Sequence, residues 1–194
     1  QAKNMQIVNC WVCELPNSIE LIGGENIVVK NCQLGAQPTG ITCKVQEVNK
    51  LSFINNQVYP DGRENLVLDA CNNCVIEGNN FKSYYNGILV LNGNDNTVNK
   101  NIFWLTGAVQ NQLLDHGDDF GIINVKGNNN MVASNSLSCE WAYAGAVTVN
   151  AVQGTGNVFK NCFVDNLESY RVFLVNAQTE VSNCVSSDKV SIVE

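Results

Sequence analysis

The chain is a succession of short apolar runs separated by polar corners that are rich in glycine and asparagine. Residues 71–103 contain one full cycle: apolar runs at 74–76 and 87–91, a polar bend at 82–83 and a Gly-Asn corner at 92–96. The pattern then starts again. None of the runs has the period of a helix, and short β-type runs between Gly and Asn are typical of strands joined by tight corners.

An asparagine followed closely by a hydrophobic residue recurs from one end of the chain to the other. These asparagines are Asn9, Asn31, Asn56, Asn79, Asn101, Asn135, Asn161 and Asn183. All successive positions but one are 22 to 26 residues apart. A period near 23 residues without helices predicts an all-β parallel β-helix, in which about eight coils stack at roughly 4.8 Å. Leucine-rich repeats have a similar period, but their Leu-x-x-Leu-x-Leu frame is missing.

The recurring asparagine has a physical reason to occupy a corner. Its backbone tolerates the left-handed conformation, and its amide bonds to nearby backbone or to the same amide one coil away. We therefore expect a ladder of stacked amides inside the helix, as in cross-β stacks.

Composition favours one domain and limits the possible ligands. The 194 residues are 45% hydrophobic and 15% charged, which suffices for a core, and no composition break divides residues 1–194. A net charge of −7 argues against nucleic acid, because phosphate contacts need basic clusters. A neutral, polyhydroxylated ligand such as a carbohydrate fits better. No run is apolar enough for a membrane span, and we expect no signal peptide within these residues.

The start of the chain has no capping helix and no polar terminal repeat, which solenoids normally require. We therefore expect residues 1–194 to be the C-terminal part of a longer architecture, or to have a partner that covers this end.

The nine cysteines are expected to be free thiols. Cys10, Cys32, Cys162 and Cys184 each directly follow a repeat asparagine, so they recur at one register and are predicted to stack as small buried hydrophobes. The two Cys-x-x-Cys pairs lie nearly three coils apart, which disfavours a four-thiolate zinc site. The sequence predicts neither a metal nor a cofactor.

One interval breaks the period: Asn101 and Asn135 are 34 residues apart. The excess lies in Trp104–Asp119, which contains the only histidine, His116, and three acids, Asp115, Asp118 and Asp119. Insertions in repeat proteins often form the binding face. These carboxylates could supply the acid and base of glycosyl chemistry, or they could be a solvated loop that caps the next strand.

A second candidate is the turn at Tyr59–Glu64, with Asp61, Arg63 and Glu64. Pro-Asp-Gly is a good turn in any protein, and Arg63 could simply pair with a nearby acid. Alternatively, its guanidinium could bind sugar hydroxyls. Tyr84 and Trp104 are placed at coil edges, where they could stack on sugar rings or cover the core.

The same segments resemble a known family. The run NNQVYPDGRENLVLDACNNCVIEGNNFKSYYNGILVLNG and the later DHGDDFGIINVKGNNNMVASNSLS are similar to the inulin fructotransferases, the difructose-dianhydride-forming enzymes of glycoside hydrolase family 91. The resemblance implies a right-handed parallel β-helix that assembles as a homotrimer with sites between subunits. It implies action on inulin-type fructan, with release of a cyclic difructose dianhydride, or hydrolysis of that product. It also implies a bacterial protein, secreted or cytoplasmic.

The resemblance also has departures. Family members are about twice as long, and Thr39 and Asn49 stand where the family has acids, although Glu47 is close. The predicted catalytic residues are Asp118, Asp119 and Glu47. The predicted sugar-binding residues are Asp61, Arg63, Glu64, Tyr84, Trp104, Asp115 and His116. The alternative is a non-catalytic carbohydrate-binding or structural β-helix, a degenerate or truncated relative. A viral or adhesin β-helix would share the fold but not the ordered motifs.

Overall fold

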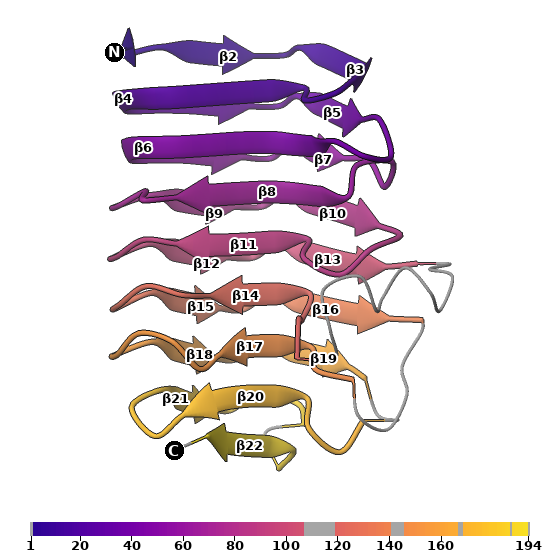
Figure 1. Ribbon diagram of the computed structural model, residues 1–194, viewed down its shortest axis with the longest axis vertical. Helices are drawn as coiled ribbons and strands as arrows, with labels where there is room; N and C mark the ends of the chain where they lie inside the picture. The colour runs from indigo at the N-terminus through magenta and orange to yellow at the C-terminus, as the bar shows by residue number, and fades with distance from the viewer. Residues whose placement is uncertain (1, 107–118, 141–145, 167–168, 187, 194) are drawn as a thin grey trace.

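A computed structural model describes residues 2–106, 119–140, 146–166, 169–186 and 188–193. In these residues the chain forms parallel sheets without helices, wound into a β-solenoid of about seven turns, with the two termini at opposite ends (Figure 1). This confirms the predicted fold, with about seven turns against about eight predicted coils. No helix long and apolar enough to cross a membrane occurs in the described residues.

Each complete coil contributes three short strands, so the solenoid has three lateral faces. Face 1 contains β8 (Glu64–Asp69), β11 (Leu89–Asn92), β14 (Ile123–Val125), β17 (Val149–Ala151), β20 (Phe173–Asn176) and β22 (Val190–Val193). Face 2 contains β2 (Gln6–Val8), β9 (Val75–Glu77), β12 (Thr97–Asn99), β15 (Met131–Ala133), β18 (Val158–Lys160) and β21 (Glu180–Ser182).

Two long strands, β4 (Ile19–Lys30) and β6 (Ile41–Ile54), run through faces 1 and 2, and the short β1 (Ala2–Lys3) pairs with the middle of β4. Face 3 is a separate seven-stranded sheet. Its strands are β3 (Trp11–Leu15), β5 (Gln33–Ala36), β7 (Gln57–Val58), β10 (Asn80–Ser83), β13 (Ile102–Leu105), β16 (Ser136–Cys139) and β19 (Phe163–Asp165).

Like residues stack on like residues because neighbouring strands are parallel and in register. Phe81 pairs with Phe103 across β10 and β13, and their rings stack with centroids 5.0 Å apart. Phe53 stacks on Phe81 at 6.1 Å from the neighbouring coil. The inward side chains of successive coils therefore form one continuous core along the axis, and the outward side chains form straight rows on each face.

The predicted amide ladder is present at the corner between faces 2 and 3. Asn56, Asn79, Asn101 and Asn135 are buried in this column, and each of the first three donates from Nδ2 to Oδ1 of the next, at 3.0, 2.9 and 3.0 Å. Each amide also donates to a backbone carbonyl of the preceding coil, as Asn79 does to Phe53 at 2.8 Å. The ladder thus satisfies polar groups that the tight corner would otherwise bury unpaired.

The asparagines that repeat in the sequence occupy two different, neighbouring positions at the corner of the coil. Asn9, Asn31, Asn161 and Asn183 are exposed and have φ between +52° and +58°. In those coils a cysteine takes the inward ladder position. The Cys162 thiol points at the carbonyl of Val132 (3.7 Å), just as the Asn135 amide donates to Val98 at 3.0 Å.

These cysteines therefore extend the ladder column with a smaller, weaker donor. Cys32, Cys162 and Cys184 are buried and Cys10 is half-buried, and all nine cysteines are free. A second ladder that the sequence analysis missed runs through Asn96, Asn130 and Asn157.

Candidate functional site

The insertion falls in the sequence between face 3 and face 1. The described chain stops at Thr106, which follows β13, and resumes at Asp119, which precedes β14. Three predicted site residues, Asp115, His116 and Asp118, lie outside the described residues. The described side chains that gather here are called the insertion corner: Arg63, Glu64, Asn86, Asp119, Phe120 and Arg171.

Amides from the neighbouring coils hold the segment that follows the insertion. Asn86 Nδ2 donates to the carbonyl of Phe120 at 2.8 Å, and Asn150 Nδ2 donates to the carbonyl of Asp119 at 2.7 Å. The backbone N–H of Gly87 also donates to the carbonyl of Gly121 at 2.9 Å. Contacts from the coils on both sides therefore fix the backbone position of Asp119, from which its side chain extends.

Asp119 is an ion-paired carboxylate at the surface. Its Oδ1 lies 2.7 Å from Nη1 of Arg171, and its side chain is 64% exposed against 20% for the arginine. A charge-assisted pair at this distance fixes the position of the carboxylate. The exposed part of the Asp119 side chain can contact a ligand at the surface.

Glu64 is the more enclosed carboxyl group of the corner. Its side chain is only 13% exposed, and Arg63 Nε lies 3.8 Å from its Oε1. Gly87 lies between Glu64 and Phe120 with φ +79°, and a Cβ there would come 2.5 Å from Phe120 Cε1 and 3.4 Å from Glu64 Cγ. The glycine thus makes room for the Phe120 ring beside the Glu64 side chain.

Trp104 and Glu140 stand at the other end of the insertion. Trp104 Nε1 donates to Glu140 Oε1 at 3.1 Å, and Thr106 Oγ1 donates to Oε2 at 2.8 Å. Lys82 Nζ lies 4.6 Å from the centroid of the Trp104 ring. Trp104 is on the outer surface of face 3, so it does not cover the core.

The other predicted residues divide between this corner and the opposite one. Asp61 is exposed in the turn before β8, and Tyr84 is 39% exposed after β10, so both border the insertion corner. Glu47 does not. It has φ +54° at the bend where β6 passes from face 1 to face 2. It lies at the far edge of face 1 and three coils from Asp119, about 14 Å along the axis alone.

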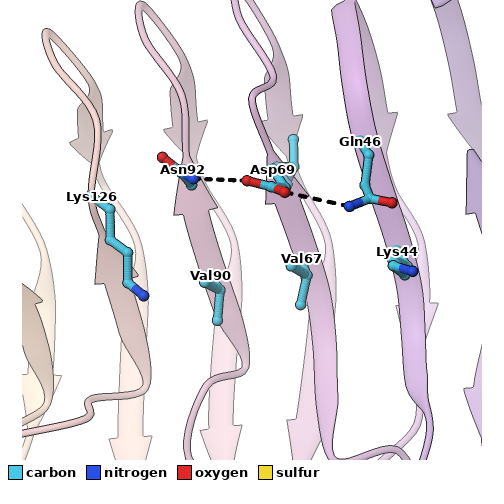
Figure 2. A pocket seen from close by; sticks show the side chains of 8 residues that line it. Lys44, Gln46, Val67, Asp69, Val90, Asn92 and Lys126 are labelled. Carbon is cyan, nitrogen blue, oxygen red and sulfur yellow. Dashed lines mark hydrogen bonds between the residues drawn. The ribbon is translucent and has the colours of Figure 1, made fainter. Parts of the chain in front are cut away.

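A second site is a shallow groove of about 160 Å³ on the outer surface of face 1 (Figure 2). Val67 and Val90 form its floor, and both carboxylate oxygens of Asp69 are bonded. Asn92 Nδ2 donates to Oδ1 at 2.7 Å and Gln46 Nε2 donates to Oδ2 at 3.4 Å. Figure 2 shows Lys44 and Lys126 on opposite sides of this row, and both line the groove.

The sequence analysis missed this groove, although a signal was available. Residues 66–69 and 89–92 have apolar runs in which every second residue faces outward. Two outward valines in adjacent coils make an apolar strip on the surface. Beside the groove, hydrogen bonding and charge attraction from Lys44 lower the pKa of the exposed Glu20 carboxyl.

These features define a parallel β-solenoid protein with an insertion at one lateral corner. Residues 3–183 match the family described as Periplasmic copper-binding protein (NosD), and the chain belongs to this family. No curated protein matches the chain.

The solved structures that resemble it include DFA-IIIase from Arthrobacter chlorophenolicus A6. The complex with GF2 has a TM-score of 0.79 at 19% identity and covers 98% of this chain and 52% of that one. The enzyme without its lid has a TM-score of 0.81 at 19% identity, covering 99% and 50%. The complex with DFA-III has a TM-score of 0.74 at 18% identity, covering 98% and 54%. The chain thus spans about half the length of these enzymes, and the likeness establishes the fold.

The copper of the family description does not fit the donors that the described residues offer. Copper prefers cysteine, methionine and histidine ligands, and among the described residues no group of three or more His, Cys, Asp or Glu side chains could hold a metal. Five of the buried thiols, those of Cys32, Cys71, Cys74, Cys162 and Cys184, have backbone carbonyls as hydrogen-bond partners.

Proposed function

We propose that this protein is a carbohydrate-active β-helix protein that acts on β-linked fructan at the insertion corner. The observation that carries the proposal is the corner itself, where two carboxyl groups in different environments lie two coils apart beside arginines and aromatic rings. The ordered motifs shared with inulin fructotransferases support fructan as the substrate. So does the likeness in fold to DFA-IIIase structures that contain GF2 and DFA-III.

In this proposal, Glu64 donates the proton to the leaving oxygen and Asp119 acts as its carboxylate partner. Glu64 is the enclosed carboxyl group, near the Phe120 ring, and Asp119 is the exposed one, paired with Arg171. The two residues are two coils apart, about 10 Å along the axis, which is just above the roughly 6.5–9.5 Å between the carboxyl groups of inverting glycosidases. That spacing leaves room for an attacking water or hydroxyl group between them. Asp118 remains a predicted catalytic acid next to Asp119.

Arg63, Asp61, Tyr84 and Trp104 would bind sugar around this pair. The guanidinium and carboxylate groups would bond to hydroxyl groups, and the aromatic rings would stack on sugar faces. Asp115 and His116 of the insertion stay predicted binding residues. Glu47 could join such a site only from another subunit, as the homotrimer implied by the resemblance would allow.

The alternative is a non-catalytic carbohydrate-binding protein. Thr39 and Asn49 at family acid positions favour it. So does the position of Glu47 at the opposite edge of face 1 from Asp119.

Two variants and a matched control separate these functions. We expect Glu64→Gln and Asp119→Asn each to lower turnover of difructose dianhydride III at least about 100-fold, since general acid–base groups contribute on this order. The control is Glu77→Gln, which removes an exposed carboxylate paired with Lys100 on face 2. Turnover that both corner variants retain would place the chemistry elsewhere. Sugar binding without turnover in the unmodified protein would favour the alternative.

A further inference from the structure

The outer surface of face 3 carries a straight row of uncharged side chains, one from each strand. The row follows the strand register from β3 to β19. Its members are Trp11, Gln33, Gln57, Asn80, Ile102, Ser136 and Phe163. None of the seven is charged, although the chain has a net charge of −7. A solvent-facing row without charge in an acidic protein points to a ligand that carries none.

Aromatic side chains stand on every second strand of this face. Trp11 of β3 and Phe163 of β19 belong to the uncharged row. Tyr59, which directly follows β7, and Trp104 of β13 lie two residues further along their strands, in the adjacent row that also contains Lys82. Figure 1 shows these strands one above another on one side of the solenoid. Trp11 is 78% exposed and Phe163 is 55% exposed. Because adjacent strands are about 4.8 Å apart, successive aromatic residues are about 10 Å apart along the axis, comparable to two sugar residues of an extended chain.

Amides fill the interval between the first aromatic residues. A hollow of about 300 Å³ beside the row is lined by Gln33, Gln57 and Asn80, together with Asn31 and Asn55 of the adjacent corner. The Tyr59 hydroxyl donates to Gln33 Oε1 at 2.9 Å, which fixes the ring beside this hollow. Amide groups both donate and accept hydrogen bonds, as sugar hydroxyls do.

We propose that face 3 is a binding platform for a neutral polysaccharide chain that lies along the solenoid axis. The aromatic rings stack on the apolar faces of alternate sugars, and the amides between them bond to hydroxyl groups. The assignment of a carbohydrate ligand to this platform rests on the proposed function, but binding there requires no catalysis. The platform would hold a long polysaccharide while one end of that polysaccharide reaches the insertion corner.

A second copy of the chain is the other possible occupant of face 3, and the surface argues against it. The centre of a protein interface is a contiguous apolar patch with few polar groups. Here the large apolar side chains at Trp11, Ile102 and Phe163 are separated by amides and a serine. A ligand rich in hydroxyl groups satisfies these amides, whereas an apolar partner would bury them unpaired.

The test is affinity electrophoresis of the whole chain in gels that contain inulin, laminarin or polygalacturonate. Trp11→Ala and Phe163→Ala each remove one ring of the platform, and we expect each to weaken binding to a neutral polysaccharide about 3- to 10-fold. Gln57→Ala removes an amide between the rings and should also weaken binding. Ile22→Ala is the matched control, because Ile22 is 65% exposed on face 1 and should leave binding unchanged. Circular dichroism confirms that each variant is folded.

Binding to inulin or laminarin that weakens in the platform variants alone supports the proposal, even if the protein cleaves neither polysaccharide. Three results would overturn it: no retardation by a neutral polysaccharide, stronger binding to polygalacturonate, or equal binding by all variants. A fourth is a change in molar mass by light scattering in the platform variants, which would identify face 3 as a self-association surface.

Discussion

Replacement of Asn79 by alanine tests how much the amide ladder contributes to stability. Asn79 Nδ2 donates to the Phe53 carbonyl at 2.8 Å and to Asn101 Oδ1 at 2.9 Å. Its Oδ1 accepts from the backbone N–H of Asn56 at 2.8 Å and from Asn56 Nδ2 at 3.0 Å. All four bonds are buried, and alanine removes them together.

The expected loss is large because the partners of Asn79 stay buried. At about 1 to 1.5 kcal/mol for each lost bond, Asn79→Ala lowers the free energy of unfolding by about 4 to 6 kcal/mol. That is a large part of the ~5–15 kcal/mol of an ordinary domain. Urea unfolding followed by circular dichroism measures the change.

Cysteine at the same position is a more informative replacement, because the chain itself places Cys32 and Cys162 in this column. Asn79→Cys keeps a weak donor toward Phe53 and should cost less than alanine. Gln57→Ala, on the outer surface of the preceding coil, is the control and should change stability by less than about 0.5 kcal/mol. A loss below about 1 kcal/mol for Asn79→Ala would refute the reasoning.

Three further predictions follow from other contacts. Gly87→Ala should displace the Phe120 ring and lower both the melting temperature and any turnover, because its Cβ would come 2.5 Å from Phe120 Cε1; unchanged values would contradict that packing. Lys44→Met should raise the pKa of Glu20 toward its ordinary value, measured by carboxyl NMR titration. Since the folded pKa is lowered, this contact stabilises the fold above the unfolded pKa, and its contribution fades as pH falls through the folded pKa. Calorimetric titration with Cu²⁺ should show no site tighter than about micromolar. A tight stoichiometric site would contradict the conclusion that the described side chains do not suit copper.

The period of the chain was enough to predict the solenoid, because each coil repeats the same corner chemistry. The sequence alone could not distinguish the two neighbouring corner positions. Asparagine serves both the left-handed position, as at Asn31, and the inward ladder position, as at Asn56. The hydrogen bonds distinguish the two positions. They also show that Cys32, which follows Asn31, takes the inward ladder position in its coil.

The candidate site was predictable in part. The break in the period located the insertion, and the turn before β8 located Arg63 and Glu64. The pairing of Arg171 with Asp119 could not be predicted, since 52 positions separate them and only the stacking of coils brings them together. The same stacking places Glu47 on the opposite edge of face 1. Distances across coils therefore had to come from the structure.

The most direct test of the proposed function is incubation of the protein with inulin and with difructose dianhydride III, followed by chromatography of the sugars. The account predicts a new product from at least one of them: a cyclic disaccharide from inulin, or a linear fructose disaccharide from the dianhydride. No product from either sugar, with the protein folded, would contradict fructan turnover at the insertion corner.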